Sequence, residues 1–93
     1  MTQPLNIIHR PDMGRFETHI EGLQCEVDYR LDDHTMHITH TGVPQALEGR
    51  GIAAGLVQHA LTWAREQGHK VHPVCSYVQV YIRRHPEWSD ILA

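Results

Sequence analysis

A run of alternating side chains between residues 23 and 31 constrains this chain more than any other feature. Polar residues separate its apolar positions, which are Leu23, Cys25, Val27, Tyr29 and Leu31. Because successive side chains of a strand point to opposite faces, this alternation predicts a strand with one buried face and argues against a helix. Cys25 lies on the buried face and is interpreted as a core residue.

Shorter segments of the same kind surround this strand. Residues 16–20 alternate in the same way, residues 36–43 form a further apolar segment, and residues 5–9 form a short apolar run. Turn-forming residues separate them at positions 10–14, 21–22 and 32–34. Neighbouring strands with such short connections predict an antiparallel meander.

The period changes from two to that of a helix after residue 51. Apolar residues recur at helical spacing up to Gln67, and Gly68 then suits a left-handed residue at the helix end. Residues 71–75 indicate a short buried strand. A second helix is expected to begin near Ser76, as its N-cap, and must end before Pro86.

The segment from Met36 to Cys75 is therefore strand, helix, strand, an order that predicts a parallel pair joined by a right-handed crossover. We expect an α+β or α/β fold built on one mixed sheet. The sheet should be antiparallel at its start and parallel between its last two strands, with a C-terminal helix. Ninety-three residues suit one domain, spanning residues 1–93.

Charge and composition argue against several classes of partner. The net charge is −3, and the eight Lys and Arg are scattered, which argues against nucleic-acid binding. The apolar stretches are much shorter than the roughly 20 residues that cross a bilayer, so no membrane association is expected. The segment from Met1 to Pro4 lacks the pattern of a secretory signal, and two cysteines do not suggest a disulfide framework. We expect a cytoplasmic protein.

The turn from Leu47 to Ala53 lies between the last meander strand and the first helix. Gly49 and Gly51 lack Cβ atoms, so the backbone can turn sharply and approach a ligand closely. Free N–H groups and the positive dipole end of the helix favour a phosphate there, and Arg50 adds a positive charge. A tight turn without a ligand remains the alternative. The turn lacks the third glycine of a Rossmann fingerprint and the Gly-Lys-Ser/Thr ending of a P-loop.

Two motifs in the chain resemble a known family. The first is Thr41-x-Val43-Pro44-x-x-Leu47-x-Gly49-Arg50-Gly51-Ile52-Ala53-x-x-Leu56-Val57. It resembles the acetyl-CoA-binding motif of the GNAT superfamily of N-acetyltransferases. The second is Val71-x-Pro73-x-Cys75-x-x-Val78-x-x-Tyr81-Ile82-x-x-His85-Pro86-Glu87-Trp88. It resembles the small, single-domain branch of that superfamily.

The resemblance covers about half of the chain and includes departures. Glu48 stands where the superfamily usually has Gln or Arg, and its carboxylate is expected to point to solvent. Ser76-Tyr77 replaces the Pro-Phe that is common in the small branch. The helices that build the acceptor pocket in larger members are replaced by turns, so the acceptor pocket should be shallow or open.

The resemblance implies a GNAT-like fold that binds acetyl-CoA or CoA. The pantetheine arm would pair with the backbone near Thr41 and Val43. The diphosphate would lie on the turn, against Glu48, Gly49, Arg50, Gly51, Ile52 and Ala53.

The resemblance also suggests catalytic residues. Cys75, just ahead of the second helix, would accept the acetyl group by thioester exchange, although a small buried hydrophobic residue is the alternative. Tyr81 would protonate the departing thiolate, unless its ring only packs on the sheet. His40 is a candidate general base, with an exposed surface histidine as the alternative. Tyr77 is interpreted as structural.

The leading hypothesis is an acetyl-CoA-dependent N-acetyltransferase with an unidentified amine acceptor, either a protein or a small molecule. The alternative is a non-catalytic acyl-CoA-binding or interaction module. A third class, a metal-binding protein, is raised by the nine histidines. His37 and His40 are expected on opposite faces of their strand, and no metal-binding motif accompanies them, so no metal site is expected.

Overall fold

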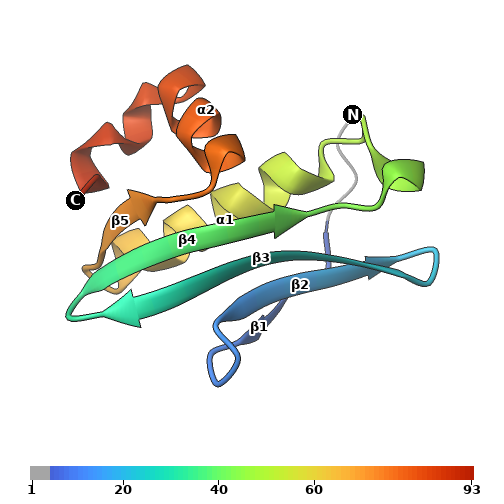
Figure 1. Cartoon of the computed structure of the whole chain (residues 1–93), viewed down its shortest axis with the longest axis horizontal. Coiled ribbons are helices and arrows are strands. Elements are labelled where there is room, and N and C mark those ends of the chain that lie inside the picture. The colour runs from blue at the N-terminus through green and yellow to red at the C-terminus, as the bar shows by residue number, and fades with distance from the viewer. Residues whose placement is uncertain (1–4) are drawn as a thin grey trace.

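The computed structural model describes residues 5–93 and contains one five-stranded sheet in the order β1-β2-β3-β4-β5 (Figure 1). The strands are β1 (Ile8–Arg10), β2 (Arg15–Ile20), β3 (Leu23–Asp32), β4 (Thr35–Gly42) and β5 (Lys70–Pro73). The pairs from β1 to β4 are antiparallel, and β4 pairs with β5 in parallel. The predicted mixed sheet is therefore confirmed.

Helix α1 (Ile52–Glu66) crosses one face of the sheet and closes the core against it. The fully buried side chains include Phe16, Val27, Met36, Ile38, Leu56, Val57 and Leu61. Gly55 lets Leu5 approach the helix, because a Cβ there would lie 2.6 Å from Leu5 Cδ1. Leu5 packs on the core from outside the sheet, so the strand expected at residues 5–9 begins only at Ile8.

Helix α2 (Ser76–Arg84) and the 3₁₀ segment η2 (Pro86–Ile91) follow β5. Cys75, not Ser76, is the N-cap of α2 and makes no side-chain capping bond. The helix ends before Pro86, as predicted. The Arg65 guanidinium of α1 lies 4.4 Å from the centre of the Trp88 ring, which holds η2 against the C-terminal end of α1.

A β-bulge interrupts the pairing of β3 with β4. Asp28 pairs with His40 and Tyr29 pairs with Ile38, so Thr39 is the extra residue. The bulge reverses the alternation along β4 and places His40 on the same outer face as His37. The prediction that these two histidines face opposite sides is therefore wrong.

Glu17 departs from the simple alternation because it is buried on the outer face. Its side chain is only 5% exposed, and it pairs with Arg10 at 3.0 Å and lies 3.7 Å from His19. The positive charge of Arg10 offsets the cost of desolvating the Glu17 carboxylate. The spacing of apolar residues in the sequence does not reveal such an ion pair.

Within residues 5–93, no helix has the length and apolarity that crossing a membrane requires. The segment Met1–Pro4, used above for the expectation of a cytoplasmic protein, lies outside the described residues.

His9 joins the short β1 strand to an aromatic cluster beneath the sheet. Its ring stacks on Phe16 with centroids 4.0 Å apart, meets Trp63 edge-on at 4.8 Å, and shares a 2.6 Å hydrogen bond with the Tyr29 hydroxyl. Burial, and secondly the charge of His59, lowers the pKa of His9. The fold therefore favours the neutral ring.

We predict that His9 makes the protein less stable in acid. Its contribution is complete above the unfolded-state pKa of about 6.5 and falls as the pH drops below that value, because protonation then favours the unfolded chain. Urea unfolding at about pH 7.5 and pH 5.5 measures this difference. The difference in unfolding free energy between the two pH values should shrink in His9→Gln. It should persist in His34→Asn, which removes a histidine from the exposed β3–β4 turn. If His9→Gln loses as much stability in acid as the wild type, His9 is not the cause of the pH dependence.

Candidate functional site

Strand β4 extends beyond its parallel partner. The last register pair between β4 and β5 is Ile38 with Pro73, and the Val74 and Cys75 N–H groups then both donate to the Ile38 carbonyl. On its other side, β4 remains paired with β3 as far as Gly42. Among the described residues, the end of β4 therefore has no strand on its β5 side, so its backbone groups are available to a ligand.

The turn after β4 brings the start of α1 toward this free edge. Leu47, in the short 3₁₀ turn η1 (Gln45–Leu47), is fully buried and anchors the turn. Gly49 and Gly51 both have left-handed backbones, with φ of 82° and 79°. Gly51 is the N-cap of α1, and neither a side-chain cap nor an acidic residue occupies the first turn. The helix therefore presents uncapped N–H groups and a positive dipole end.

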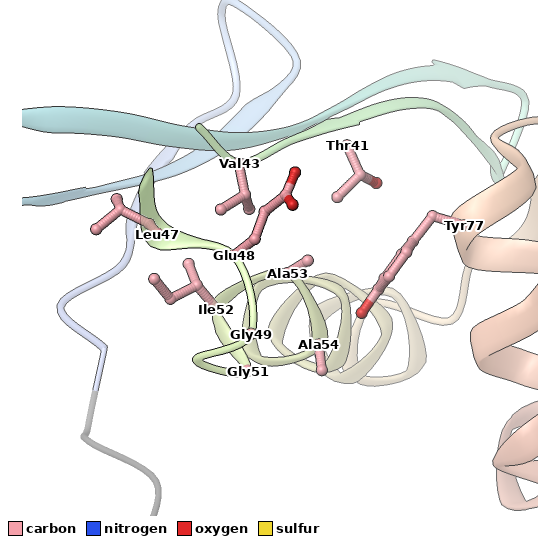
Figure 2. A pocket seen from close by; sticks show the side chains of 10 residues that line it. All are labelled: Thr41, Val43, Leu47, Glu48, Gly49, Gly51, Ile52, Ala53, Ala54 and Tyr77. Carbon is pink, nitrogen blue, oxygen red and sulfur yellow. The ribbon is translucent and has the colours of Figure 1, made fainter. Parts of the chain in front are cut away.

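A pocket of about 420 Å³ lies between the free edge and the helix start (Figure 2). The residues that line it are Thr41, Val43, Leu47, Glu48, Gly49, Gly51, Ile52, Ala53, Ala54 and Tyr77. Its volume is within the range of about 300–1,000 Å³ that small-molecule sites occupy. Seven of the eight residues expected to bind the cofactor thus lie around one cavity. The exception is Arg50.

Arg50 pairs with a different part of the chain. Its guanidinium Nη1 lies 2.5 Å from Glu21 Oε2, and both side chains are exposed. Glu21 belongs to the β2–β3 hairpin, so this ion pair ties the turn to the hairpin. The contact of Arg50 with a phosphate stays a prediction, which requires its exposed side chain to leave Glu21.

Glu48 lies on the rim of the pocket. Figure 2 shows its carboxylate between Val43 and Thr41, on the pocket side of the turn. The side chain is exposed, as expected, and it also lines the pocket. A negative charge therefore lies beside the place where an anionic ligand was expected.

Cys75 touches the pocket wall from the start of α2. Its Sγ lies 3.6 Å from the hydroxyl of Thr41, and the thiol is free and half-buried. The thiol therefore lies at the point where β4 and β5 separate. Cys25, by contrast, is fully buried in the core, where burial raises the pKa of its thiol.

Tyr77, and not Tyr81, lines the pocket. Figure 2 shows Tyr77 reaching from α2 toward Ala53 and Ala54 on α1. Tyr81 lies on the buried side of α2 and stacks on His85 with centroids 4.1 Å apart. Burial raises the pKa of Tyr81, and Glu87 and Tyr77 raise it further, while a hydrogen bond from Trp88 lowers it. Tyr77, interpreted from the sequence as structural, therefore lines the pocket, and its position just after β5 is the sequence signal for this place.

His40 is on the outer face of the sheet and does not line the pocket. Its Nε2 lies 3.1 Å from Glu26 Oε2. His37 is on the same face and shares a 2.9 Å hydrogen bond with His72 of β5. Within residues 5–93, no three His, Cys, Asp or Glu side chains lie close enough to hold a metal ion.

Comparisons with known proteins identify relatives of this chain. A family model described as GCN5-related N-acetyl-transferase matches residues 15–91. Protein NATD1 from Gallus gallus is 43% identical over 87 residues, which cover 89% of this chain and 78% of that protein. Protein NATD1 from Xenopus tropicalis is 40% identical over 52 residues, which cover 56% of this chain but only 48% of that protein.

A solved structure has the same fold. It is the NMR solution structure of a GCN5-like protein from Staphylococcus aureus, with a TM-score of 0.77 and 25% sequence identity. The match covers 96% of this chain and 88% of that one.

Two left-handed glycines, Gly49 before α1 and Gly68 after it, provide a matched test of the turn. A Cβ at Gly49 or Gly68 meets no atom within 4 Å, and the two φ angles are similar. Alanine at either position should cost about 1 kcal/mol of unfolding free energy, because a Cβ is strained there. Only Gly49→Ala should weaken CoA binding, by roughly tenfold, since only Gly49 lines the pocket. Equal CoA affinities in the two variants, by calorimetry, would contradict the assigned site.

Proposed function

Because the chain belongs to the GCN5-related N-acetyltransferase family, we propose that it binds acetyl-CoA in the pocket and transfers the acetyl group to an amine. The observation that carries this proposal is the pocket itself, where the free edge of β4 faces the uncapped start of α1. Seven residues selected from the sequence motif lie around it.

The start of α1 suits a diphosphate. The turn between Gly49 and Gly51 leaves the first N–H groups of the helix without a side-chain acceptor, and the helix dipole adds a favourable field. Gly49 leaves open space over the backbone, so phosphate oxygens can approach the amides closely. These groups would hold the diphosphate without a cationic side chain.

The free edge of β4 suits the pantetheine arm. Beyond Ile38, the peptide groups of β4 have no partner on the β5 side in the described part of the chain. The amides of pantetheine would pair with them as a strand does. Thr41 and Val43, which line the pocket, would direct the acyl end toward Cys75.

Acetyl-CoA supplies an activated acyl group as a thioester. The contact between Cys75 and Thr41 supports a relay. In this route the Cys75 sulfur gives up its proton and bonds to the acetyl carbon, and the CoA thiol leaves with a proton. An amine nitrogen then bonds to the same carbon, and the Cys75 sulfur leaves and regains a proton. Cys75 is the N-cap of α2, so this sulfur lies at the start of that helix.

Tyr77 takes the place of Tyr81 in this proposal. Burial raises the pKa of Tyr77, and Arg84 partly offsets this effect. The phenol therefore keeps its proton at neutral pH and is available to protonate a leaving thiolate. Tyr81 would serve as a packing residue instead.

Incubation with acetyl-CoA, followed by intact-mass analysis, tests the relay. The wild-type protein should gain one acetyl group, carried by the peptide that contains Cys75. Cys75→Ala should lose this adduct and slow the acetylation of a lysine amide probe by at least about 100-fold. Cys25→Ala, the matched control, should keep both the acetyl adduct and the wild-type rate of acetylation.

The outcomes separate the candidate functions. Full turnover by Cys75→Ala would remove the relay and leave direct transfer. CoA binding without an adduct or any acetylated amine would favour a non-catalytic acyl-CoA-binding module, an alternative that the carboxylate of Glu48 in the pocket also supports.

We predict that Glu48→Gln tightens CoA binding. Removing one negative charge near the diphosphate should contribute about 1 kcal/mol, or roughly fivefold in affinity. The gain should shrink at high salt, because ions screen the repulsion. Glu66→Gln, at the far end of α1, changes the same net charge and should leave the affinity unchanged. A weaker affinity in Glu48→Gln would indicate that the carboxylate binds the ligand.

A further inference from the structure

Two histidines from different strands meet on the outer face of the sheet. His37 of β4 and His72 of β5 are directly opposite each other in the parallel register, and their Nδ1 atoms lie 2.9 Å apart. Figure 1 shows β5 lying beside β4 before the two strands separate. His72 is exposed and His37 is half-buried, so neither side chain belongs to the core. The sheet therefore brings two imidazole nitrogens together at a place that solvent reaches.

The backbone of the sheet holds the two rings in this arrangement. Met36 and Val71, the preceding residues of the two strands, are fully buried against the helices. Because side chains alternate along a strand, their burial directs His37 and His72 to the opposite face. Neighbouring strands lie about 4.8 Å apart, so side chains that are in register lie next to each other. The separation of the rings is thus set by the paired strands and not by a loop.

The distance between the two nitrogens suits two ligands of one metal ion. A bond from a divalent transition metal to an imidazole nitrogen is about 2.0–2.1 Å long. Two such bonds at a right angle place the nitrogens about 2.9 Å apart, whereas a tetrahedral angle places them about 3.3 Å apart. Right angles between neighbouring ligands are typical of tetragonal Cu²⁺ and Ni²⁺ sites. The observed 2.9 Å therefore fits these ions better than a tetrahedral zinc site.

The protons of the pair can rearrange to admit a metal ion. In the hydrogen bond, one Nδ1 carries a proton and the other accepts it. A metal ion needs a lone pair on both Nδ1 atoms, which two neutral rings provide when each carries its proton on Nε2. The rings lie at 81° to each other and can turn in their exposed setting until both lone pairs face one ion.

We propose that His37 and His72 form a binding site for a divalent transition metal such as Cu²⁺ or Ni²⁺, with water as the remaining ligands. The ion would join β4 to β5 one residue before their last register pair, Ile38 with Pro73. This inference does not rest on the proposed function and is tested without CoA.

The sequence analysis expected no metal site because it compared His37 only with His40 of the same strand. The partner of His37 is 35 residues away in the sequence. Spacing along the chain therefore does not indicate the pair, and only the parallel register brings the two residues together.

Two cationic side chains lie near the pair on the same face. Lys70, two residues before His72, donates from its Nζ to the Asp90 carbonyl at 3.1 Å, which holds its charge toward η2. Arg30 is opposite His37 on β3 and is exposed, so its charge opposes a bound cation. Arg30→Gln should therefore tighten metal binding by about threefold, since it removes this repulsion.

A second pair of histidines on the same two sides of the sheet provides the control. The rings of His34 and His69 are stacked with centroids 6.0 Å apart, and no hydrogen bond joins them within the described residues. His69 Nδ1 is buried and has no hydrogen-bond partner in the same part of the chain. This pair lacks the close contact of two ring nitrogens, so His34→Asn removes a histidine without changing the proposed site.

Calorimetric titration with Ni²⁺ at about pH 7.5 tests the site, because Ni²⁺ does not oxidise thiols. The wild-type protein should bind one Ni²⁺ per chain, and Zn²⁺ should bind more weakly. His37→Asn and His72→Asn should each weaken Ni²⁺ binding by at least about tenfold, since each removes one of the two protein ligands. His34→Asn should match the wild type, and the urea midpoint without metal shows whether each variant remains folded.

A second measurement needs no variant. Paramagnetic Ni²⁺ broadens the signals of nearby nuclei, so the backbone amides of residues 36–38 and 71–73 should broaden first in the ¹⁵N-labelled wild-type protein. Ni²⁺ should also raise the urea midpoint of the wild type, because the paired strands that hold both ligands exist only in the folded chain.

Four results would each overturn the inference. They are the absence of saturable Ni²⁺ binding, equal affinity in the wild type and the two variants of the pair, tighter binding of Zn²⁺ than of Ni²⁺, and broadening that is centred on other residues.

Discussion

The separation of β4 from β5 after Ile38 and Pro73 is the constraint from which the proposed site follows. If β5 continued beside β4, it would occupy the backbone groups of residues 39–42 and leave no edge for a ligand. Instead, Val74 and Cys75 both bond to the Ile38 carbonyl, and the chain turns into α2. This turn places Cys75 and Tyr77 next to the pocket and leaves the end of β4 without a strand on its β5 side among the described residues.

Much of the fold could be predicted because its signals are local. The alternation from Leu23 to Leu31 fixed β3, and the helical spacing after Gly51 fixed α1. The pocket could be predicted for the same reason, since the residues of the turn are adjacent in sequence and a glycine-rich entry to a helix has a known use. Seven expected residues meet there because one continuous segment carries them.

The rest depends on contacts between distant segments. The bulge at Thr39 moves His40 to the outer face, and periodicity alone does not reveal an extra residue in a strand. Glu17 is buried with Arg10 of β1 as its ion-pair partner, and Tyr77 of α2 reaches the pocket beside α1, while Tyr81 does not. In each case a partner from another element decides the position, so single-residue reasoning assigned the wrong surroundings.

The proposed site depends most directly on diphosphate binding by the amides at the start of α1. Titration of the ¹⁵N-labelled protein with CoA, followed by backbone amide NMR, measures this binding residue by residue. We expect the largest shifts at residues 48–54 and along residues 39–43, with small shifts in the β2–β3 hairpin. If the amides of residues 48–54 do not move at saturating CoA, or if the largest shifts lie elsewhere, the proposed site is wrong.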